Sequence, residues 1–292
     1  MSESYILHQL KKFRNQIEGD LLKDYSSRIL YATDASAYRE LPLAVIKPRN
    51  KEDIRKLVLF AGKHGVSLIP RGAGTSLAGQ VVGNGIVVDV TRYLNKIIEI
   101  NPKERWVRVE PGVVLDELNI ALARHDLFFG PETSSSNRCV IGGMVGNNSC
   151  GAHSLIYGST RDHTLEIEAI LSDGSMVKFK ALSKEEFQQK QIGETLENKL
   201  YRNITDILSL PLNKEEIRKE YPDPMVKRRN TGYAIDLLLE SEPFSESDVR
   251  FNFCKLLAGS EGTLAFITEI KRNRVRLPPK VNGLISVYVD WL

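Results

Sequence analysis

The sequence has few cysteines and no long apolar run, and these two shortages exclude several classes of protein. Its three cysteines, Cys139, Cys150 and Cys254, form no C-x-x-C pair. This spacing predicts neither a disulfide framework nor a metal site, and it favours reduced thiols in a cytoplasmic protein. No stretch approaches the roughly 20 apolar residues that span a bilayer. The segment Met1 to Ser4 lacks the basic and apolar regions of a signal peptide, so we expect no secretion.

An excess of charge of one sign is also missing. Forty Lys and Arg residues against 37 Asp and Glu residues leave a formal net charge of +3, and these charges are scattered along the chain. This pattern gives no indication of nucleic-acid binding. A chain of 292 residues that are 42% apolar and 26% charged is typical of a soluble globular protein of mixed helix and strand. Its length allows two lobes.

The apolar pattern predicts an alternation of strands and helices. Strands are expected at 44–48, 66–70, 86–90, 96–100, 106–110, 264–270 and 284–291, a hairpin at 166–171 and 176–180, and helices at 4–17, 51–64, 114–125, within 183–220 and at 246–257. Asn50 is expected to cap the helix at 51–64, with Asp53 completing the capping pattern and Gly65 ending the helix. The chain stops inside the last strand, which indicates truncation.

The most informative segment is a glycine-rich loop that follows the strand at 66–70. It contains Pro70-Arg71-Gly72-Ala73-Gly74-Thr75-Ser76-Leu77-Ala78-Gly79-Gln80. Small residues let backbone N–H groups crowd around an anion, and the hydroxyls of Thr75 and Ser76 add donors. The loop therefore predicts a phosphate site, although by itself it is also consistent with a turn that binds nothing.

This loop matches neither of the two common nucleotide motifs. Leu77 stands where the dinucleotide fingerprint needs a third small residue. Gln80 and Val81 replace the Lys and the Ser or Thr of the P-loop. The chain also continues into a strand, at 86–90, and not into a helix. We interpret the segment as a third kind of phosphate loop.

Two further clusters of small residues follow the loop. The second cluster is Gly130-Pro131-Glu132-Thr133-Ser134-Ser135 with Ile141-Gly142-Gly143-Met144-Val145-Gly146-Asn147-Asn148-Ser149-Cys150-Gly151, and the third runs from Gly259-Ser260-Glu261-Gly262 to Ile267. In this order, the three clusters resemble the FAD-binding domain of the vanillyl-alcohol oxidase (PCMH-type) superfamily, over about residues 40–275. Three ordered motifs are far more specific than one.

Within that superfamily, the sequence is most similar to the branch of glycolate oxidase, D-lactate dehydrogenase and D-2-hydroxyglutarate dehydrogenase. Asn230-Thr231-Gly232-Tyr233 also looks like this branch. Residues 142–162 look most like the long members, which carry a C-terminal iron–sulfur module. No cysteine cluster for such a module lies in this chain.

The resemblance implies an α+β, two-subdomain PCMH-type FAD-binding fold. Residues 1–39 would be an N-terminal extension, and 40–276 the FAD-binding domain, with subdomains at about 40–133 and 134–276. Residues 277–292 would begin a truncated substrate-cap domain. Members with covalent flavin often carry a histidine in the phosphate loop, where this sequence has Thr75, so we expect non-covalent FAD.

The resemblance also implies the cofactor-binding residues. The glycine-rich loop would wrap the FAD pyrophosphate, the second cluster would line the flavin and phosphates, and the third would lie near the adenosine half. The full set is Pro70, Arg71, Gly72, Ala73, Gly74, Thr75, Ser76, Gln80, Pro131, Glu132, Thr133, Ser134, Gly142, Gly143, Asn147, Asn148, Ser149, Cys150, Gly151, Glu261, Gly262 and Ile267. No catalytic residue and no metal ligand is assigned.

Several individual residues keep two interpretations. Arg71 is either near the phosphates or in an ion pair. Cys150 either approaches the flavin or packs as a small residue, with packing favoured. His163 is interpreted as structural. The basic run at 227–229 is read as a solvated surface patch, with contact to an acidic substrate or partner as the alternative.

The reaction implied is oxidation of a small 2-hydroxy acid, with hydride transfer to flavin N5 and an unknown electron acceptor. In this family the cap domain supplies the base, so we expect this chain to hold FAD weakly and to turn over poorly alone. Two alternatives stay open. One is a flavoenzyme like UDP-N-acetylenolpyruvoylglucosamine reductase, which uses NADPH. The other is a binding module without catalysis.

Overall fold

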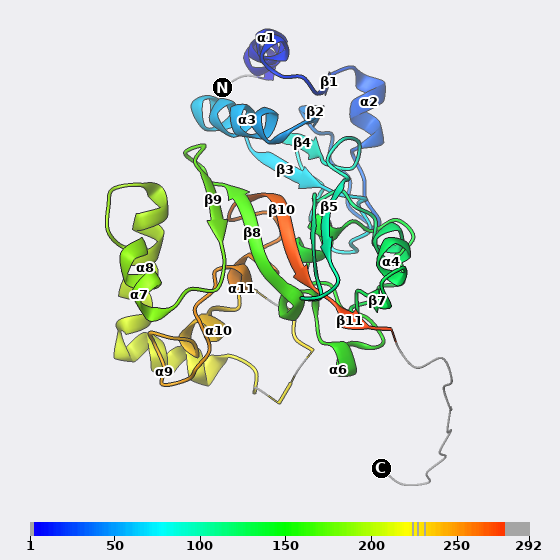
Figure 1. The fold of residues 1–292 in the computed structure, drawn as a ribbon. Helices are drawn as coiled ribbons and strands as arrows, with labels where there is room; N and C mark the ends of the chain where they lie inside the picture. The colour runs from blue at the N-terminus through cyan, green and yellow to red at the C-terminus, as the bar shows by residue number, and fades with distance from the viewer. Residues whose placement is uncertain (1–2, 224, 227, 231, 278–292) are drawn as a thin grey trace.

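The computed structural model describes residues 3–223, 225–226, 228–230 and 232–277. They form an α+β fold with two main sheets (Figure 1). The first sheet has the order β1 (Asp20–Leu22), β2 (Ala44–Lys47), β4 (Ile86–Asp89), β3 (Leu68–Arg71). Strands β2, β4 and β3 are parallel, and β1 is antiparallel to β2. Strand β4 is buried throughout and β2 nearly so, which explains their continuous apolar runs.

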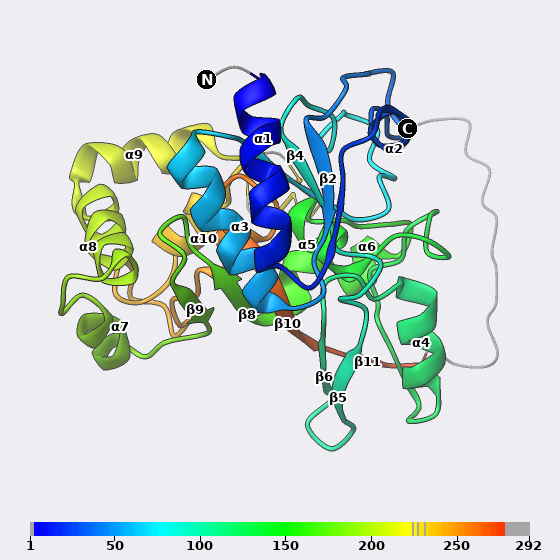
Figure 2. The same cartoon turned by 90° about the horizontal axis from the view of Figure 1, so that it is seen from above.

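Two helices cover this sheet, α1 (Glu3–Phe13) and α3 (Lys51–His64), and Figure 2 shows them side by side. Apolar side chains from both helices share one buried core with β2 and β4. The expected limits of α3 are confirmed, because the Asn50 side chain accepts from the Asp53 N–H and Gly65 ends the helix with φ 58°. The capping pattern also predicts that the Asp53 side chain accepts a hydrogen bond from the Asn50 backbone N–H, and this part of the prediction is wrong.

The Asp53 carboxylate instead accepts hydrogen bonds from the backbone N–H groups of Glu18, Gly19 and Arg49, at 2.8 to 2.9 Å. Its side chain is 1% exposed, so it needs such donors. The carboxylate therefore ties the start of α3 to the turn before β1. Sequence spacing showed the cap but not this long-range partner.

The second sheet is antiparallel, in the order β5 (Ile97–Asn101), β6 (Trp106–Val109), β10 (Phe266–Asn273), β8 (Thr164–Ile170), β9 (Met176–Phe179). The expected hairpin is confirmed as β8 and β9. Strand β10 comes from the far end of the described chain and lies in the centre (Figure 1). A small ribbon pairs β7 (Leu127–Phe128) with β11 (Val275–Arg276).

The remaining helices surround these sheets. They are η1 (Arg14–Gln16), α2 (Tyr25–Leu30), α4 (Leu115–Ala123), α5 (Ile141–Gly146), α6 (Ser154–Tyr157), η2 (Thr160–His163), α7 (Lys184–Lys190), α8 (Leu196–Ser209), α9 (Pro211–Glu220), α10 (Ile235–Leu239) and α11 (Cys254–Leu257). The helical region at 183–220 is confirmed as three helices. No helix in the described part of the chain is long and apolar enough to cross a bilayer.

The helix expected at 246–257 is wrong over most of its length, because only Cys254–Leu257 is helical. Phe251 forms an isolated β-bridge with Leu182, and its ring packs against Phe187 and Phe253. The apolar residues of this segment therefore fill an aromatic core from an extended backbone. Periodicity alone does not separate these two cases in a short segment.

The two sheets divide the chain between Asp89 and Ile97, earlier than the subdomain border expected near residue 133. Residues 1–39 were expected as an extension, yet they supply β1 to the first sheet and α1 to its core. A local pattern does not show which sheet a strand will join, because pairing is set by distant residues. The expected strand at 284–291 and the cap domain, apart from Leu277, lie outside the described residues.

A network of ionised side chains links helix α3 to the second sheet. Lys51 of α3 places its Nζ 2.6 Å from Glu168 Oε2 on β8 and 2.7 Å from Glu269 Oε2 on β10. Arg108 of β6 contacts Glu269 at 2.9 Å and Glu166 at 3.2 Å. Such networks are worth more than isolated surface pairs. We infer that Lys51 holds α3, which covers the first sheet, against the second sheet, and that Arg108 links three strands of the second sheet.

We expect that protonation of Glu166 in acid weakens this network of ion pairs. Burial raises the pKa of its carboxyl, but hydrogen bonds from Lys271, Lys178 and Arg108 outweigh burial and lower the pKa from 4.5 to about 2. Because the folded pKa lies below the unfolded one, the stabilisation is complete above the unfolded pKa and is lost as pH falls towards about 2. Urea midpoints of wild type and Glu166→Gln should converge as the pH is lowered from neutral. Glu99→Gln, an exposed position on the same sheet, is the control, and a gap independent of pH contradicts the prediction.

Candidate cofactor site

The glycine-rich loop leaves β3 at Arg71 and turns back over the edge of the first sheet. Gly74 has φ 67°, a left-handed conformation that favours glycine. The loop packs closely on the second cluster, since a Cβ on Gly72 would lie 2.5 Å from Val140 Cγ2. The backbone of the loop thus reaches the start of α5, as a phosphate loop of small residues requires.

The third cluster docks on the same helix. The Gly259 N–H donates to Val145 O and the Glu261 N–H to Gly146 O, both at 2.9 Å. These two bonds fall on carbonyl groups in the last turn of α5, and Val145 O also accepts from the Asn148 N–H at 3.1 Å. All three small-residue clusters therefore meet around α5, although residues 81–258 separate the first cluster from the third along the chain.

Gln80 links the three clusters through its side chain. Its Nε2 donates to Asn147 Oδ1 at 3.5 Å and to Glu261 Oε1 at 3.3 Å, and its Oε1 accepts from the Ser76 hydroxyl. These bonds connect the first cluster with the second and the third. Gln80 was predicted as a cofactor residue, and the structure shows that it also holds neighbouring residues of the site in place.

A cavity of about 460 Å³ lies between the clusters, at the carboxyl end of β3 and the start of β10. Its walls include most of the predicted cofactor residues: Pro70, Arg71, Gly72, Ala73, Gly74, Thr75, Ser76, Gln80, Thr133, Ser134, Gly142, Gly143, Asn147, Ser149, Cys150, Glu261, Gly262 and Ile267. The volume is within the range of about 300–1,000 Å³ typical of cofactor and ligand pockets. Carboxyl ends of parallel strands are a common place for such pockets.

Arg71 lines this cavity, but its guanidinium makes other contacts. Nη1 donates to Tyr31 O at 3.2 Å and Nη2 to Thr33 O at 2.8 Å. Burial lowers the pKa of this guanidinium, while the carboxylate of Asp34 opposes that shift. The Ala35 N–H also donates to Gly74 O at 3.0 Å. Residues 31–35 of the expected extension thus fasten the glycine-rich loop, with Arg71 as the central link.

We expect Arg71→Gln to weaken FAD binding by loosening this loop, by about three- to tenfold for the loss of one or two hydrogen bonds. The salt dependence of FAD binding should not change, because a positioning arginine adds no ion pair with phosphate. Fluorescence titration of FAD at several salt concentrations measures both quantities. Arg39→Gln, an exposed position on the same segment, is the control. A weaker salt dependence in Arg71→Gln would show direct phosphate contact instead.

Four predicted cofactor residues do not line the cavity: Pro131, Glu132, Asn148 and Gly151. Asn148 is fully buried; its Oδ1 accepts from the Arg161 N–H at 2.8 Å and its Nδ2 donates to Asn230 Oδ1 at 3.3 Å. Glu132 Oε2 lies 2.6 Å from His153 Nδ1, and a side chain on Gly151 would overlap the Glu132 carbonyl. These residues lie behind the residues that line the cavity and support them.

The cavity also has walls outside the predicted cofactor set: Leu77, Val81, Val90, Pro111, Ser135, Cys139, Val140, Met144, Gly146, Arg228, Asn230, Ala265 and Phe266. Most are neighbours of the motif residues, and their proximity in sequence was the available signal. Arg228 and Asn230 are different, because neither the basic run at 227–229 nor the motif at 230–233 was assigned to the cofactor site. Arg228 Nε and Asn230 Nδ2 each lie 3.2 Å from Cys150 Sγ.

The basic run at 227–229 is therefore not only a solvated patch. Arg228 lines the cavity, and the Arg229 side chain is 17% exposed and pairs with Asp236. Lys227 lies outside the described residues. His163 fits its structural interpretation: Nε2 lies 2.5 Å from Tyr157 O, and burial lowers its pKa.

The residues present fit a dinucleotide cofactor. Gly143 opens into the cavity, since a Cβ there would meet only Val140 Cγ2, at 3.8 Å. Small residues with free backbone N–H groups suit a diphosphate, whose charges need many donors. Val140, Met144 and Ile267 supply apolar surface of the kind that a flavin ring needs.

Comparisons with known proteins agree with this geometry. Residues 42–180 match the family model described as an FAD binding domain. D-2-hydroxyglutarate dehydrogenases of Haemophilus influenzae and Escherichia coli K12 are each 37% identical over 98% of this chain, which covers 28% and 27% of their lengths. Glycolate oxidase subunit GlcD of Bacillus subtilis is 34% identical over 52% of this chain and 33% of its own length.

Solved structures share the fold. An alkyldihydroxyacetonephosphate synthase superposes with a TM-score of 0.61 at 18% identity, over 95% of this chain and 41% of its own. The BBE-like 1 protein of Physcomitrella patens gives a TM-score of 0.60 at 15% identity, over 91% of this chain and 44% of its own. This chain spans little more than a quarter of the length of the first curated relatives. From the family match and the homology, we conclude that residues 42–180 form an FAD binding domain and that the chain is homologous to D-2-hydroxyglutarate dehydrogenases, with a fold that it shares with the solved structures.

Proposed function

We propose that this chain is the FAD-binding portion of a flavin-dependent dehydrogenase that oxidises a small 2-hydroxy acid. The observation that carries the proposal is the meeting of the three small-residue clusters around one cavity. The homology to D-2-hydroxyglutarate dehydrogenases over 98% of the chain supports the substrate class. FAD, when bound, would supply the chemistry, which is the acceptance of a hydride from the carbon that carries the hydroxyl group.

The protein's own part in this proposal is to bind and orient. Backbone N–H groups at 72–76 and the hydroxyl of Thr75 would hold the diphosphate, while the Ser76 hydroxyl donates to Gln80. Gly143 leaves room for it above α5, whereas Gly142 lets the helix pack closely against Pro111. Thr75 stands where members with covalent flavin often carry a histidine, and this supports non-covalent attachment of FAD. The predicted cofactor residues that line the cavity are proposed as the binding set.

We propose that the base and the groups that recognise the substrate carboxylate come from outside this chain. We propose that the FAD-binding domain spans residues 40–276. Residues 31–35 lie outside these bounds but hold the glycine-rich loop in place through hydrogen bonds. The electron acceptor and the cytoplasmic location stay predictions.

Visible absorption of the purified chain with added FAD tests the first half of the proposal. We expect a flavin spectrum whose bands shift on binding and whose flavin is released by denaturation, since the attachment is non-covalent. A preparation that takes up no FAD would contradict the proposal. A flavin that stays on the denatured chain would contradict only the non-covalent attachment.

A panel of D-2-hydroxy acids with an artificial electron acceptor tests the second half, on the longest natural form of the protein and on this chain. We expect bleaching of the flavin by a 2-hydroxy acid in the longer form and little turnover by this chain alone. Bleaching by NADPH without a hydroxy acid would favour the reductase alternative. Rapid turnover by the chain alone would show that the base lies within it.

A further inference from the structure

Two arginine side chains at the end of β10 are buried without a charged partner. Arg272 is fully buried, and Arg274 is 2% exposed. Arg272 donates from Nη2 to Thr160 O at 3.1 Å, and Arg274 donates from Nη1 to Asn273 O at 2.5 Å. Among the described residues, Nε and Nη1 of Arg272 and Nε and Nη2 of Arg274 find no acceptor. Both guanidinium groups therefore keep most of their hydrogen-bonding capacity unused.

One phenylalanine ring lies against both guanidinium groups. The Cζ atom of Arg272 is 3.9 Å from the centroid of the Phe129 ring, and the Cζ atom of Arg274 is 5.2 Å from it. Phe129 is fully buried as well. The face of an aromatic ring attracts a cation, but it carries no charge that could neutralise one. Arg272, Arg274 and Phe129, the arginine cluster, thus hold a net positive charge.

No carboxylate of the described residues offsets the charge of the arginine cluster. Burial alone lowers the pKa of Arg272 to about 9, and burial together with the charge of Arg272 lowers the pKa of Arg274. Burial, and with it the charges of both arginines, also lowers the pKa of His163, although Asp162 opposes this shift. Because arginine keeps its proton in proteins, both charges are present at neutral pH.

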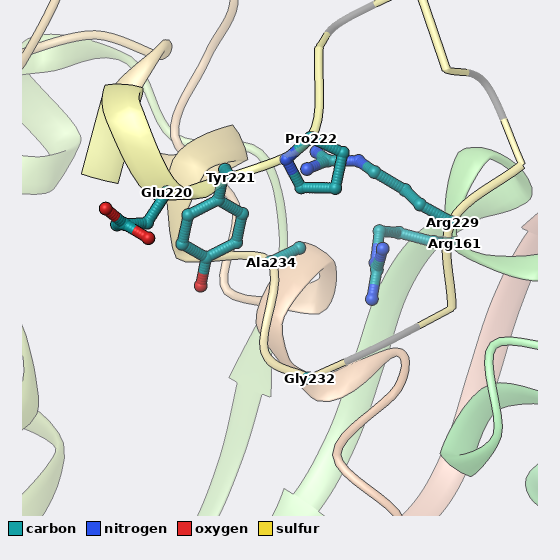
Figure 3. A pocket seen from close by; sticks show the side chains of 7 residues that line it. All are labelled: Arg161, Glu220, Tyr221, Pro222, Arg229, Gly232 and Ala234. Atoms are coloured by element: carbon teal, nitrogen blue, oxygen red, sulfur yellow. The ribbon is translucent and has the colours of Figure 1, made fainter. Parts of the chain in front are cut away.

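Other cations of the same region differ, because carboxylates balance them. Arg161 of η2 and Arg229 line a cavity of about 250 Å³, and Figure 3 shows their side chains close together there. Asp236 pairs with Arg229. Burial lowers the pKa of Arg161, and the carboxylates of Asp162 and Asp236 oppose that shift. The arginine cluster has no such counterpart in the described part of the chain.

The arginine cluster lies behind one wall of the cofactor cavity. Thr160, which accepts the hydrogen bond from Arg272, donates its N–H and its hydroxyl to Ser149 O at 3.0 and 2.7 Å. Ser149 and Cys150 line the cofactor cavity. A single hydrogen-bonded residue thus stands between the Arg272 guanidinium and this wall. Across such a short path through the protein interior, one charge acts strongly on another and salt screens it little.

We propose that the buried positive charge of Arg272 and Arg274 stabilises the reduced form of FAD in the cofactor cavity. This inference rests on the proposed function and places the flavin ring at the wall formed by Ser149. Oxidation of a 2-hydroxy acid to the 2-keto acid passes a hydride, two electrons and one proton, to FAD, while the hydroxyl proton goes to the base. FAD thereby gains one negative charge, which a fixed positive charge attracts without rearrangement. The two arginines act at a distance and are positioning residues for this charge.

The reduction potential of bound FAD tests the proposal without turnover. It is measured on the longest natural form of the protein, by slow reduction with xanthine and xanthine oxidase beside a reference dye. In Arg272→Met, we expect the affinity for reduced FAD to fall about tenfold relative to that for oxidised FAD, which lowers the potential by about 30 mV. The melting temperature without FAD should not fall, because methionine replaces an unpaired buried charge with an apolar side chain of similar length.

Two variants show whether the charge itself is the cause. Arg272→Lys keeps a positive charge, so its potential should lie closer to that of wild type than the potential of Arg272→Met does. Arg276→Met removes an exposed charge from β11 and is the matched control. Water and salt screen an exposed charge, so the potential should not change in this control. The lowered potential of Arg272→Met should persist at high salt.

An unchanged potential in folded Arg272→Met with FAD bound would overturn this inference and leave the proposed function intact. An equal fall in Arg276→Met would overturn it as well, because the effect would then not depend on burial. If Arg272→Met failed to fold, Arg274→Met would take its place with the same expected direction. A wild-type protein that takes up no FAD would overturn the proposed function together with this inference.

Discussion

Gly143→Leu should abolish FAD binding and leave the fold intact. Gly143 lies on α5 with ordinary helical backbone, and a Cβ there meets only Val140 Cγ2 at 3.8 Å. The rest of a leucine side chain would extend into the cavity where we place the diphosphate. We expect the dissociation constant for FAD to rise about 100-fold or more, equivalent to at least ~2.7 kcal/mol. Fluorescence titration measures it, and the melting temperature of the FAD-free chain should not fall, since leucine favours helix over glycine.

Two variants serve as controls for this prediction. Gly143→Ala adds a single methyl group and should weaken FAD binding much less than leucine does. Gly62→Leu changes a helical glycine on α3 that has no neighbour within 4 Å of an added Cβ, so FAD binding should not change. Normal FAD binding by Gly143→Leu would show that the diphosphate lies elsewhere.

Asn148→Leu should destabilise the protein strongly. Asn148 is fully buried, with φ 45°, and its side chain bonds the Arg161 N–H and Asn230. Leucine would leave a buried N–H without an acceptor and would be strained in a left-handed conformation that asparagine tolerates. We expect a loss of about 2–4 kcal/mol in the free energy of unfolding, measured by urea titration.

Graded substitutions separate the two causes. Asn148→Gly relieves the backbone strain but loses the hydrogen bonds, so it should fall between wild type and leucine. Asn148→Asp keeps the acceptor for the Arg161 N–H and should be milder than leucine. Asn137→Leu, at an exposed position in the same region, should cost no more than about 0.5 kcal/mol. If Asn148→Leu behaved like Asn137→Leu, the linking role of Asn148 would be wrong.

Much of the local structure was predictable because its causes are local. Asn50 and Gly65 limit α3 through their own backbone and side-chain chemistry, and the turn at 172–175 sets the β8–β9 hairpin. The segment 246–257 shows the opposite case, since its apolar residues fit a helix as well as an extended chain. Its partner, Leu182, lies far away in sequence, and that pairing decided the outcome.

The cofactor site divides in the same way. The sequence identified most of its walls through glycine-rich clusters, because only small residues let a backbone approach an anion closely. It did not show whether Asn148 faces the cavity or supports it from behind, nor that Arg71 turns to the carbonyl groups of residues 31 and 33. Those outcomes depend on which distant groups become neighbours.

By itself, the amino-acid sequence determined that this chain mixes helix and strand and carries three clusters of small residues, since glycine spacing and strand patterns act over a few residues, and its family resemblance implied the α+β fold and the FAD. Only the tertiary structure decided that β10 joins the hairpin to β5 and β6, that residues 31–35 fasten the phosphate loop, and that Arg161 and Arg229 face one cavity. The physical reason is burial: a hydrogen-bonding or charged group removed from water takes whichever partner the packed chain brings to it, and that partner is set by the whole fold.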